Sequence, residues 1–518
     1  MNPLREPARF PAGEKRLVME GVATPEDRAA SPYMYLPFVV PEGTETITVR
    51  YEYDERGVID IGMLDPDIGP FPARKGFRGW SGSARREFVI TADSATPGYV
   101  PGIIQPGTWQ VILGLHRIPA DGCRYRVEVV LDEPVVGASG GVGAPGGATS
   151  PFRMAQGQGA TGGEGLRGLL PGDEPGPPDA AESAPEEFRQ RTGRAWRRGD
   201  LHSHTFHSDA KGSPEALAEA ARARGLQFLA ITDHNTASHH PFLKALERSG
   251  FLVIPGEEIT TDRGHANVWG IQGWVDFRIL SDEDIDRLVQ EAHERGGLIS
   301  VNHPKRGGPP WTYPIAEGFD CFEAWQMLWP THNREALDLY DSLLRQGRRL
   351  TLVGGSDWHH PADYAGPAGS AWTEGFNIGH PTTWLDMREL TVAGALDALR
   401  RGAAFVSEAP AGPMVHVRVG GVDMGGCFPW RRGETPAAEA LIVGARGDRV
   451  RWIGSGGVLR EADIDGDVFV DRWELVEPSG YVRVEVYRRF GQAGPGEPLE
   501  RVRALSNPVY IAREGSSR

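Results

Sequence analysis

Between residues 196 and 380, short apolar runs alternate with helical patterns, and this alternation constrains the fold most strongly. A helix is predicted to begin at Pro214, where Ser213 can cap it, and to end before Gly225. A second helix is predicted over 282–296. The apolar runs are short enough to be buried strands and occupy 226–231, 251–254, 297–301 and 350–353. Repeated strand–helix units favour an α/β fold with a largely parallel sheet, most economically a barrel.

A histidine or a carboxylate follows the end of each predicted strand. Of the 15 histidines, all but His116 and His416 lie between residues 202 and 380. The residues after the strands are Asp200, His202 and His204, then Asp233 and His234, Glu257, Glu258 and His265, His303, and finally Asp357 and His359. Functional groups of a βα barrel gather at the carboxyl ends of its strands, so we expect these side chains to meet. The sequence therefore predicts a metal centre.

The kinds of ligand narrow the chemistry of this centre. Imidazole and carboxylate groups suit zinc, manganese or iron ions. The only three cysteines, Cys123, Cys321 and Cys427, lie far apart, so neither a disulfide framework nor a thiolate zinc site is expected. A carboxylate can bridge two ions about 3.5–4 Å apart, and such a pair can hold a hydroxide nucleophile. The pattern favours hydrolysis over redox chemistry.

Five motifs occur in a fixed order: D-L-H-x-H-T-x-x-S-D, T-D-H, P-G-x-E, N-H-P and G-S-D-x-H. Together they resemble the PHP (polymerase and histidinol phosphatase) superfamily of metallohydrolases. The resemblance is strongest over 198–410 and implies a distorted (β/α)7 barrel with two or three divalent metal ions. The segments FRGWSGS and ATPGYVPG in the N-terminal region resemble the carbaryl-hydrolase-like branch of that superfamily.

The resemblance also implies a ligand set, assigned here by position in the motifs. One ion would take His202, His204, Glu258 and Asp357; a second would share Glu258 and take His265 and His303; a third would take Asp209, His234 and His359. The P-G-x-E register selects Glu258 over its neighbour Glu257. Asp357, His303 and Glu258 are the predicted catalytic residues.

Composition divides the chain into four parts. Residues 1–133 contain period-two alternation, as in 46–53, 108–116 and 124–131, which predicts a β-sandwich-like domain. Residues 134–195 are rich in Gly and Pro and are predicted to be a linker or insertion. Residues 196–410 are the predicted PHP barrel. Residues 411–518 return to strand patterns and are predicted to be a second β-sandwich-like domain.

Two residues are candidate substrate contacts. Lys305 and Arg306 directly follow the N-H-P motif, and a guanidinium there suits a bidentate phosphate contact. The alternative is that 305–308 form a solvated loop. The leading interpretation is a phosphoesterase that acts on a small phosphorylated metabolite or nucleotide through a metal-bound hydroxide. A carbamate, amide or ester hydrolase with the same metals is the second interpretation, and a metal-stabilised binding scaffold is a third, of another class.

The net charge of −15 is spread along the chain and leaves no basic stripe for a nucleic-acid groove. No run approaches the ~20 apolar residues that span a bilayer, and the first residues contain no apolar leader segment. We therefore expect a cytoplasmic protein whose partner is a small-molecule substrate. The sequence pattern specifies no oligomeric state.

Overall fold

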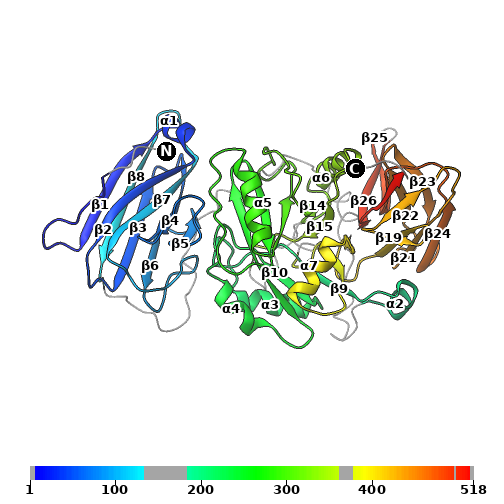
Figure 1. The fold of residues 1–518 in the computed structure, drawn as a ribbon, viewed down its shortest axis with the longest axis horizontal. Helices are drawn as coiled ribbons and strands as arrows, with labels where there is room; N and C mark the ends of the chain where they lie inside the picture. The colour runs from blue at the N-terminus through cyan, green and yellow to red at the C-terminus, as the bar shows by residue number, and fades with distance from the viewer. Residues whose placement is uncertain (1–5, 134–183, 361–376, 495–496, 514–518) are drawn as a thin grey trace.

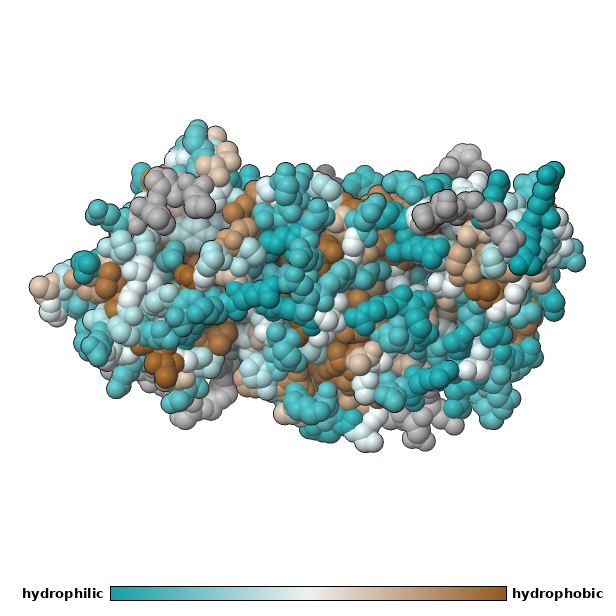
Figure 2. Space-filling view, viewed as in Figure 1, coloured by the Kyte–Doolittle hydropathy of each residue, from teal (hydrophilic) through white to brown (hydrophobic). Residues whose placement is uncertain are grey.

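The computed structural model describes residues 6–133, 184–360, 377–494 and 497–513. The chain is elongated, with an N-terminal β region, a central α/β region and a C-terminal β region in a row (Figure 1). Hydrophilic side chains cover most of the face drawn in Figure 2, with apolar patches between them. Among the described residues, no helix is long and apolar enough to cross a membrane.

The N-terminal region consists of two four-stranded antiparallel sheets that share one apolar core. One sheet has the order β1 (Arg16–Ala23), β8 (Cys123–Leu131), β3 (Thr46–Tyr53) and β6 (Glu87–Thr91). The other has the order β2 (Tyr33–Val40), β7 (Gly107–Arg117), β4 (Val58–Leu64) and β5 (Phe77–Gly82), and the short helix α1 (Pro25–Ala30) precedes β2. The alternating sequences place Ile59, Ile61 and Met63 of β4 in the shared core.

The second of these sheets uses its other face to pack on the central region. Leu64 and Trp80 belong to the same apolar cluster as Val268 and Phe277, and the rings of Trp80 and Phe277 lie 4.8 Å apart. Across this interface, Gly98 donates its backbone N–H to Ser238 Oγ (3.1 Å). The FRGWSGS segment is therefore a strand whose tryptophan anchors two regions to each other.

The central region contains one mixed sheet of nine strands. Its order is β15 (Thr351–Gly355), β14 (Cys321–Gln326), β13 (Leu298–Asn302), β12 (Gly264–Trp269), β11 (Leu252–Thr261), β10 (Phe228–Ile231), β9 (Trp196–Asp200), β16 (Thr382–Asp386) and β17 (Ala404–Ser407). Strands β9–β11 and β13–β15 pair in parallel, while β12, β16 and β17 pair antiparallel with their neighbours. The sheet is thus less parallel than expected, because the tight turn after Thr261 returns the chain as a hairpin. Among the described residues no strand ladder joins β15 to β16, so a closed barrel is not seen.

Helices follow most of these strands and bury one apolar face. Helix α3 (Pro214–Ala223) begins as predicted, since Ser213 Oγ accepts the N–H of Ala216 at 3.2 Å. The others are α4 (His240–Leu246), α5 (Asp284–Glu294), α6 (Asn333–Arg345) and α7 (Val392–Arg400). Helix α2 (Glu186–Thr192) lies within the segment predicted as linker. Its Phe188 packs on Trp196, the first residue of β9. Residues 134–183 of that segment lie outside the described residues.

The C-terminal region continues the central sheet through pairing of β17 with β26 (Glu497–Ser506). Beyond it lie β25 (Tyr481–Gly494), β22 (Arg449–Gly454) and β23 (Gly457–Asp463), with β20 (Cys427–Trp430) and β27 (Val509–Arg513) beside them. A separate antiparallel sheet has the order β19 (Val422–Asp423), β18 (Met414–Val419), β21 (Ala437–Val443) and β24 (Val468–Glu474). Inner residues of both layers form one apolar cluster. The described residues after 410 thus form a region built of strands.

Candidate metal centre

The chain segments that follow β9 and β15 lie side by side and pair with each other. Asp357 donates its backbone N–H to the carbonyl of His202 (2.9 Å), and His204 donates to the carbonyl of Trp358 (3.0 Å). This short parallel pairing places the side chains after β9 beside those after β15, although the two segments are separated by about 150 residues. Glu258 on β11 and His303 after β13 complete the ring of side chains.

Four side chains converge at the first predicted ion position. Nε2 of His202 lies 3.2 Å from Glu258 Oε1 and 3.3 Å from Asp357 Oδ1. Nε2 of His204 lies 2.9 Å from Asp357 Oδ1 and 3.6 Å from Glu258 Oε2. Two ligand atoms that each lie about 2.1 Å from one ion are themselves about 3–3.5 Å apart. The spacing is therefore that of a ligand set.

The second and third predicted positions lie on either side of the first. Glu258 Oε1 is 3.3 Å from both His265 Nδ1 and His303 Nε2. Asp209 Oδ1 is 3.1 Å from His359 Nε2 and 3.5 Å from His234 Nε2, and these two histidine nitrogens are 3.4 Å apart. All nine predicted ligands thus lie in one cluster. Glu257, by contrast, points elsewhere and accepts the backbone N–H of Val275 (2.8 Å).

Several donor atoms in this cluster are buried and make no hydrogen bond to any described residue. They are His202 Nε2, both ring nitrogens of His204, Asp209 Oδ1, Glu258 Oε2 and Asp357 Oδ1. Buried polar atoms are otherwise almost always satisfied, because an unmade bond costs about 1–3 kcal/mol each. Nitrogen and oxygen atoms that converge without hydrogen bonds between them fit divalent cations of the zinc, manganese or iron kind.

Electrostatics keeps the carboxylates of the cluster ionised. Burial alone would raise the pKa of Glu258, but His202, His265 and His234 around it hold that pKa well below its usual range. Burial likewise opposes ionisation of Asp357, yet His202 and His359 hold its pKa well below normal. Burial and the neighbouring His359 and His234 lower the pKa of His204 to about 3. An ionised carboxylate and a neutral imidazole are the forms that ligate metals.

The backbone is strained at this cluster. His303 and Asp357 have φ angles of 28° and 53°, in the left-handed region, and Asn235 directly after His234 has φ 52°. Such conformations cost about 1–3 kcal/mol for a residue other than glycine and persist where function requires them. Two of the three predicted catalytic residues therefore sit on strained backbone.

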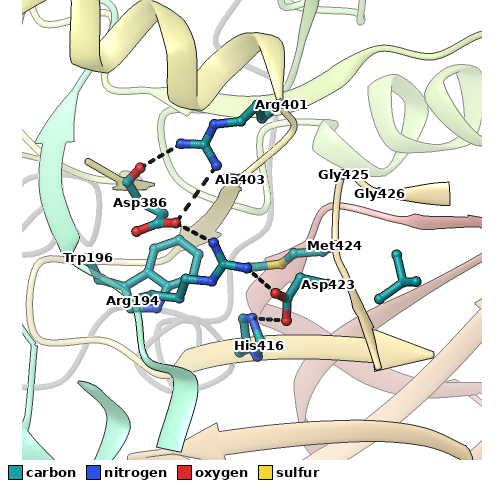
Figure 3. Close-up of a pocket in the computed structure, with 11 residues that line it drawn as sticks. Arg194, Trp196, Asp386, Arg401, Ala403, His416, Asp423, Met424, Gly425 and Gly426 are labelled. Atoms are coloured by element: carbon teal, nitrogen blue, oxygen red, sulfur yellow. Dashed lines mark hydrogen bonds and ion pairs between the residues drawn. The ribbon is translucent and has the colours of Figure 1, made fainter. Parts of the chain in front are cut away.

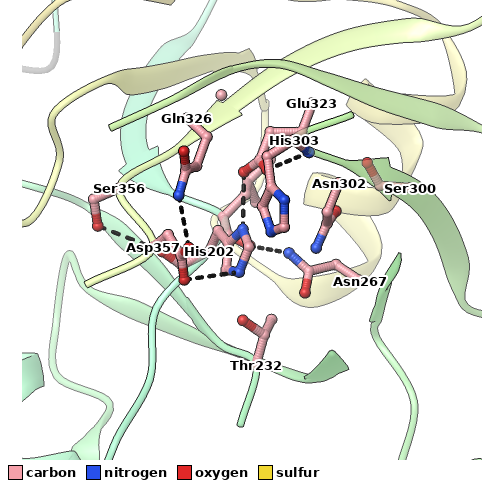
Figure 4. A network of polar contacts seen from close by, with 12 residues as sticks. His202, Thr232, Asn267, Ser300, Asn302, His303, Glu323, Gln326, Ser356 and Asp357 are labelled. Carbon is pink, nitrogen blue, oxygen red and sulfur yellow. Dashed lines mark hydrogen bonds and ion pairs between the residues drawn. The ribbon is translucent and has the colours of Figure 1, made fainter. Parts of the chain in front are cut away.

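Glu323 on β14 contacts two of the predicted ligands, and the sequence pattern did not reveal it. Its Oε1 lies 2.9 Å from His202 Nδ1, and its Oε2 accepts the backbone N–H of His303 (3.1 Å). In Figure 4, Glu323 and His303 lie beside the imidazole of His202. A carboxylate on the far nitrogen of a ligating histidine fixes the tautomer and the ring orientation. Gln326 acts similarly on Asp357, since its Nε2 donates to Oδ2 (2.7 Å).

Two buried aspartates hold the loops that carry the ligands. Asp200 accepts backbone N–H bonds from His202 (3.1 Å), Ser356 (3.0 Å) and Gly379 (2.8 Å). Asp233 accepts from the N–H and hydroxyl of Thr205 (2.7 and 2.6 Å) and fixes the turn before Asp209. The first Asp of D-L-H and the Asp of T-D-H are thus positioning residues.

The two predicted substrate contacts face other partners. The Nζ of Lys305 is buried and donates to Gln326 O (2.9 Å), Thr331 Oγ1 (3.0 Å) and Asn333 Oδ1 (2.7 Å). The side chain of Arg306 is 77% exposed and pairs with Glu335 (2.5 Å). Neither cation points its donors toward the cluster, so their role as substrate contacts stays a prediction without geometric support.

A cavity of about 450 Å³ lies away from the cluster, between β9, β16, α7 and the C-terminal strands (Figure 3). Its charged side chains are paired with one another. Arg194 bridges Asp386 (3.0 Å) and Asp423, and His416 Nε2 lies 3.2 Å from the same Asp423. This arrangement joins the central and C-terminal regions and supplies no catalytic set.

Comparison with known proteins agrees with this placement. Residues 200–307 match the family model of the PHP domain. An uncharacterized protein of Methanocaldococcus jannaschii is 29% identical over 125 residues, which are 21% of this chain and 67% of that protein. The 5'-3' exoribonuclease Rnm of Escherichia coli is 48% identical over 65 residues, which are 12% of this chain and only 22% of that enzyme.

Solved structures give weaker likenesses. A two-domain protein from Bacteroides vulgatus, described as containing a predicted PHP-like metal-dependent phosphoesterase, has a TM-score of 0.35 and 16% identity, over 60% of this chain and 96% of its own. An amidohydrolase from Chromobacterium violaceum has a TM-score of 0.23 and 17% identity, over 31% and 87%. The segment from Asp200 to Gly307, which carries seven of the nine cluster residues, is the part that matches the PHP domain.

Proposed function

We propose that this chain is a metal-dependent hydrolase that cleaves a phosphoester of a small metabolite or nucleotide. The observation that carries the proposal is the partly buried cluster of nine imidazole and carboxylate side chains, several of whose buried atoms make no hydrogen bond. We also propose that the central sheet is a PHP-type (β/α)7 barrel, distorted by its β11–β12 hairpin, and that the outer regions are β-sandwich-like.

The residues of the cluster have different roles in the proposed hydrolysis. Two or three zinc, manganese or iron ions held there would polarise a phosphoryl oxygen and neutralise the charge that develops in the transition state. Glu258 lies beside predicted ligands of all three positions, so it is the carboxylate that would be shared between ions held there. Asp357 is oriented by Gln326 and His202 by Glu323, so the ligand geometry is set before substrate arrives.

The nature of the relatives supports phosphorus chemistry. The E. coli relative is named an exoribonuclease, and cleavage of RNA breaks a phosphoester bond. The similarity covers a small part of that enzyme, so it supports the bond type and leaves the substrate to be tested.

A second candidate is a hydrolase of carbamates or carboxylic esters, as the resemblance to the carbaryl-hydrolase-like branch implies. One observation favours it: Lys305 and Arg306 are both bound to protein groups, so neither offers a free cation to a phosphate. A neutral substrate would need no such cation.

The deciding experiment loads the chain with Mn²⁺, Zn²⁺ or Fe²⁺ and measures its hydrolysis of two substrate classes. One class is aryl phosphate and nucleotide monophosphates, and the other is aryl carbamates and esters. Phosphate turnover that Asp357→Asn reduces at least about a hundredfold supports the proposal. Asp397→Asn, the same change on the exposed face of α7, serves as the control and should leave turnover unchanged. Turnover of carbamates or esters alone would establish the second candidate instead.

A further inference from the structure

The N-terminal sheet presents two polar side chains to the central region. Along β4, Ile59, Ile61 and Met63 face the core of the N-terminal region, so Asp60, Gly62 and Leu64 face the other way. Along β7, Val111, Leu113 and Leu115 face the same core. His116 follows at a bulge, since Leu115 pairs with Ile59 and Arg117 with Val58, and it lies near enough to Asp60 to lower the pKa of that carboxyl. The two strands pair with Asp60 opposite Gly114, two residues before His116.

Glycine at two positions makes room for this arrangement. A Cβ on Gly114 would lie 2.8 Å from the ring of Trp80 and 3.1 Å from Asp60 Cβ, and one on Gly62 would lie 2.6 Å from the same ring. Trp80 therefore lies flat across the outer face of the sheet, with Asp60 at its edge. Because Trp80 packs on Phe277 of the central region, the edge that carries Asp60 abuts that region as well.

The pKa of Asp60 responds to charges of the predicted ligand cluster. Burial raises its pKa to about 6, and His116 and His234 lower it while Asp209 raises it. The edge of this sheet touches the loop that carries the predicted ligand Asp209, since a Cβ on Gly98 would lie 2.8 Å from the carbonyl oxygen of Trp80 and 2.9 Å from that of His207. Three contacts fix the two regions nearby: Gly98 N–H donates to Ser238 Oγ (3.1 Å), Thr236 Oγ1 donates to Gly98 O (3.0 Å), and Arg85 donates to Phe206 O.

Neither residue has a role in the ligand set. Asp60 and His116 come from another region of the chain and are half-buried rather than sealed in the core. A carboxylate at that place accepts hydrogen bonds from hydroxyl groups and repels a second anion.

We propose that Asp60 and His116 form the wall of the substrate site that binds the leaving group, and that this group is rich in hydroxyls, such as a sugar or polyol. The inference rests on the proposed function, since it names the leaving group of that hydrolysis. It makes the N-terminal region a part of the substrate site and assigns substrate selection to it.

The test compares Asp60→Ala and His116→Ala with wild type on three substrates: ribose 5-phosphate, phenyl phosphate and ribose 1,5-bisphosphate. For Asp60→Ala we expect KM for ribose 5-phosphate to rise about tenfold at nearly unchanged kcat, the loss of one hydrogen bond to a charged group. KM for phenyl phosphate should stay within twofold of wild type, and KM for the bisphosphate should fall. His116→Ala should raise KM for ribose 5-phosphate alone.

Glu52→Gln, on the exposed side of β3 in the other N-terminal sheet, is the control and should change none of these constants. A thermal melt shows that each variant folds. The inference would be overturned if Asp60→Ala raised KM equally for all three substrates, or if it changed KM for none of them.

Failure of the proposed function gives a different result. If wild type turns over no phosphate but hydrolyses acetate esters, the phosphoester proposal fails, and glyceryl and phenyl acetate provide the same contrast between leaving groups. If Asp60→Ala then raises KM for glyceryl acetate but not for phenyl acetate, the result still supports Asp60 as part of the leaving-group site. A wild-type chain that turns over neither class overturns both.

Discussion

Replacing Glu323 by Gln should weaken metal binding without unfolding the protein. The carboxylate is 2% exposed and makes two contacts, to His202 Nδ1 at 2.9 Å and to the N–H of His303 at 3.1 Å. Burial lowers the pKa of His202, but Glu323, Asp357 and Glu258 outweigh burial and raise it. Loss of the Glu323 charge removes a large part of the field that orients this imidazole.

The magnitude follows from those two contacts. A hydrogen bond to a charged group contributes about 1.5–3 kcal/mol. The amide of Gln keeps one acceptor, so we expect about half of the effect, or about 1.4 kcal/mol, which is tenfold in affinity. Glu323→Ala removes both acceptors, and a loss nearer a hundredfold is expected, in line with the range for supporting groups of metal ligands.

The assay is competition for Zn²⁺ or Mn²⁺ against a chromophoric chelator, together with the melting temperature of the metal-free protein. Glu317→Gln, at an exposed position before β14, is the matched control and should bind metal as wild type does. The reasoning is refuted if Glu323→Gln keeps wild-type affinity, or if the metal-free variant melts far below wild type, since the residue would then act on folding and not on His202.

Three further outcomes are expected. Gly355→Ala should lose metal affinity in the same competition assay, because a Cβ there would lie 2.3 Å from His202 Cβ and 2.7 Å from Glu323 Oε1; unchanged affinity would show that His202 can shift freely. Chelation should lower the melting temperature reversibly, and metal at 100 times its Kd should restore about 2.7 kcal/mol, whereas an unchanged melt would argue against a site. Burial opposes ionisation of Glu485, but Arg334 and Arg483 lower its pKa to about 2, so its stabilisation is present above about pH 4.5 and is lost as pH falls toward 2. Urea titrations should therefore show Glu485→Gln destabilised by about 3–5 kcal/mol at pH 7, with the difference shrinking in acid.

Much of the cluster could be predicted because its ligands follow strand ends in short motifs. The predicted strand 46–53 is β3 residue for residue, and Ser213 caps α3 as expected. The nine predicted ligands meet because the residues after β9 pair with those after β15, a contact between distant segments that local patterns do not show.

What could not be predicted depends on contacts between distant segments. Glu323 lies in CFEAWQ, which reads as an apolar strand with one acid, and its partner His202 is 121 residues away. Lys305 reads as part of a solvated loop, yet Gln326, Thr331 and Asn333 supply enough acceptors to bury its ammonium group. Asp60 gains its place only because a whole sheet docks beside the cluster. Periodicity carries no information on any of these three.

The pairing of residues 202–204 with 357–358 has a consequence for how the chain folds. The first predicted ligands are synthesised about 150 residues before the last, and the segment 202–204 after β9 makes its pairing with 357–358 only once the chain beyond β15 is present. Contacts of such large sequence separation form slowly. A chain shortened before β15 should therefore lack a complete ligand set, and tight metal uptake would report that the central region has finished folding.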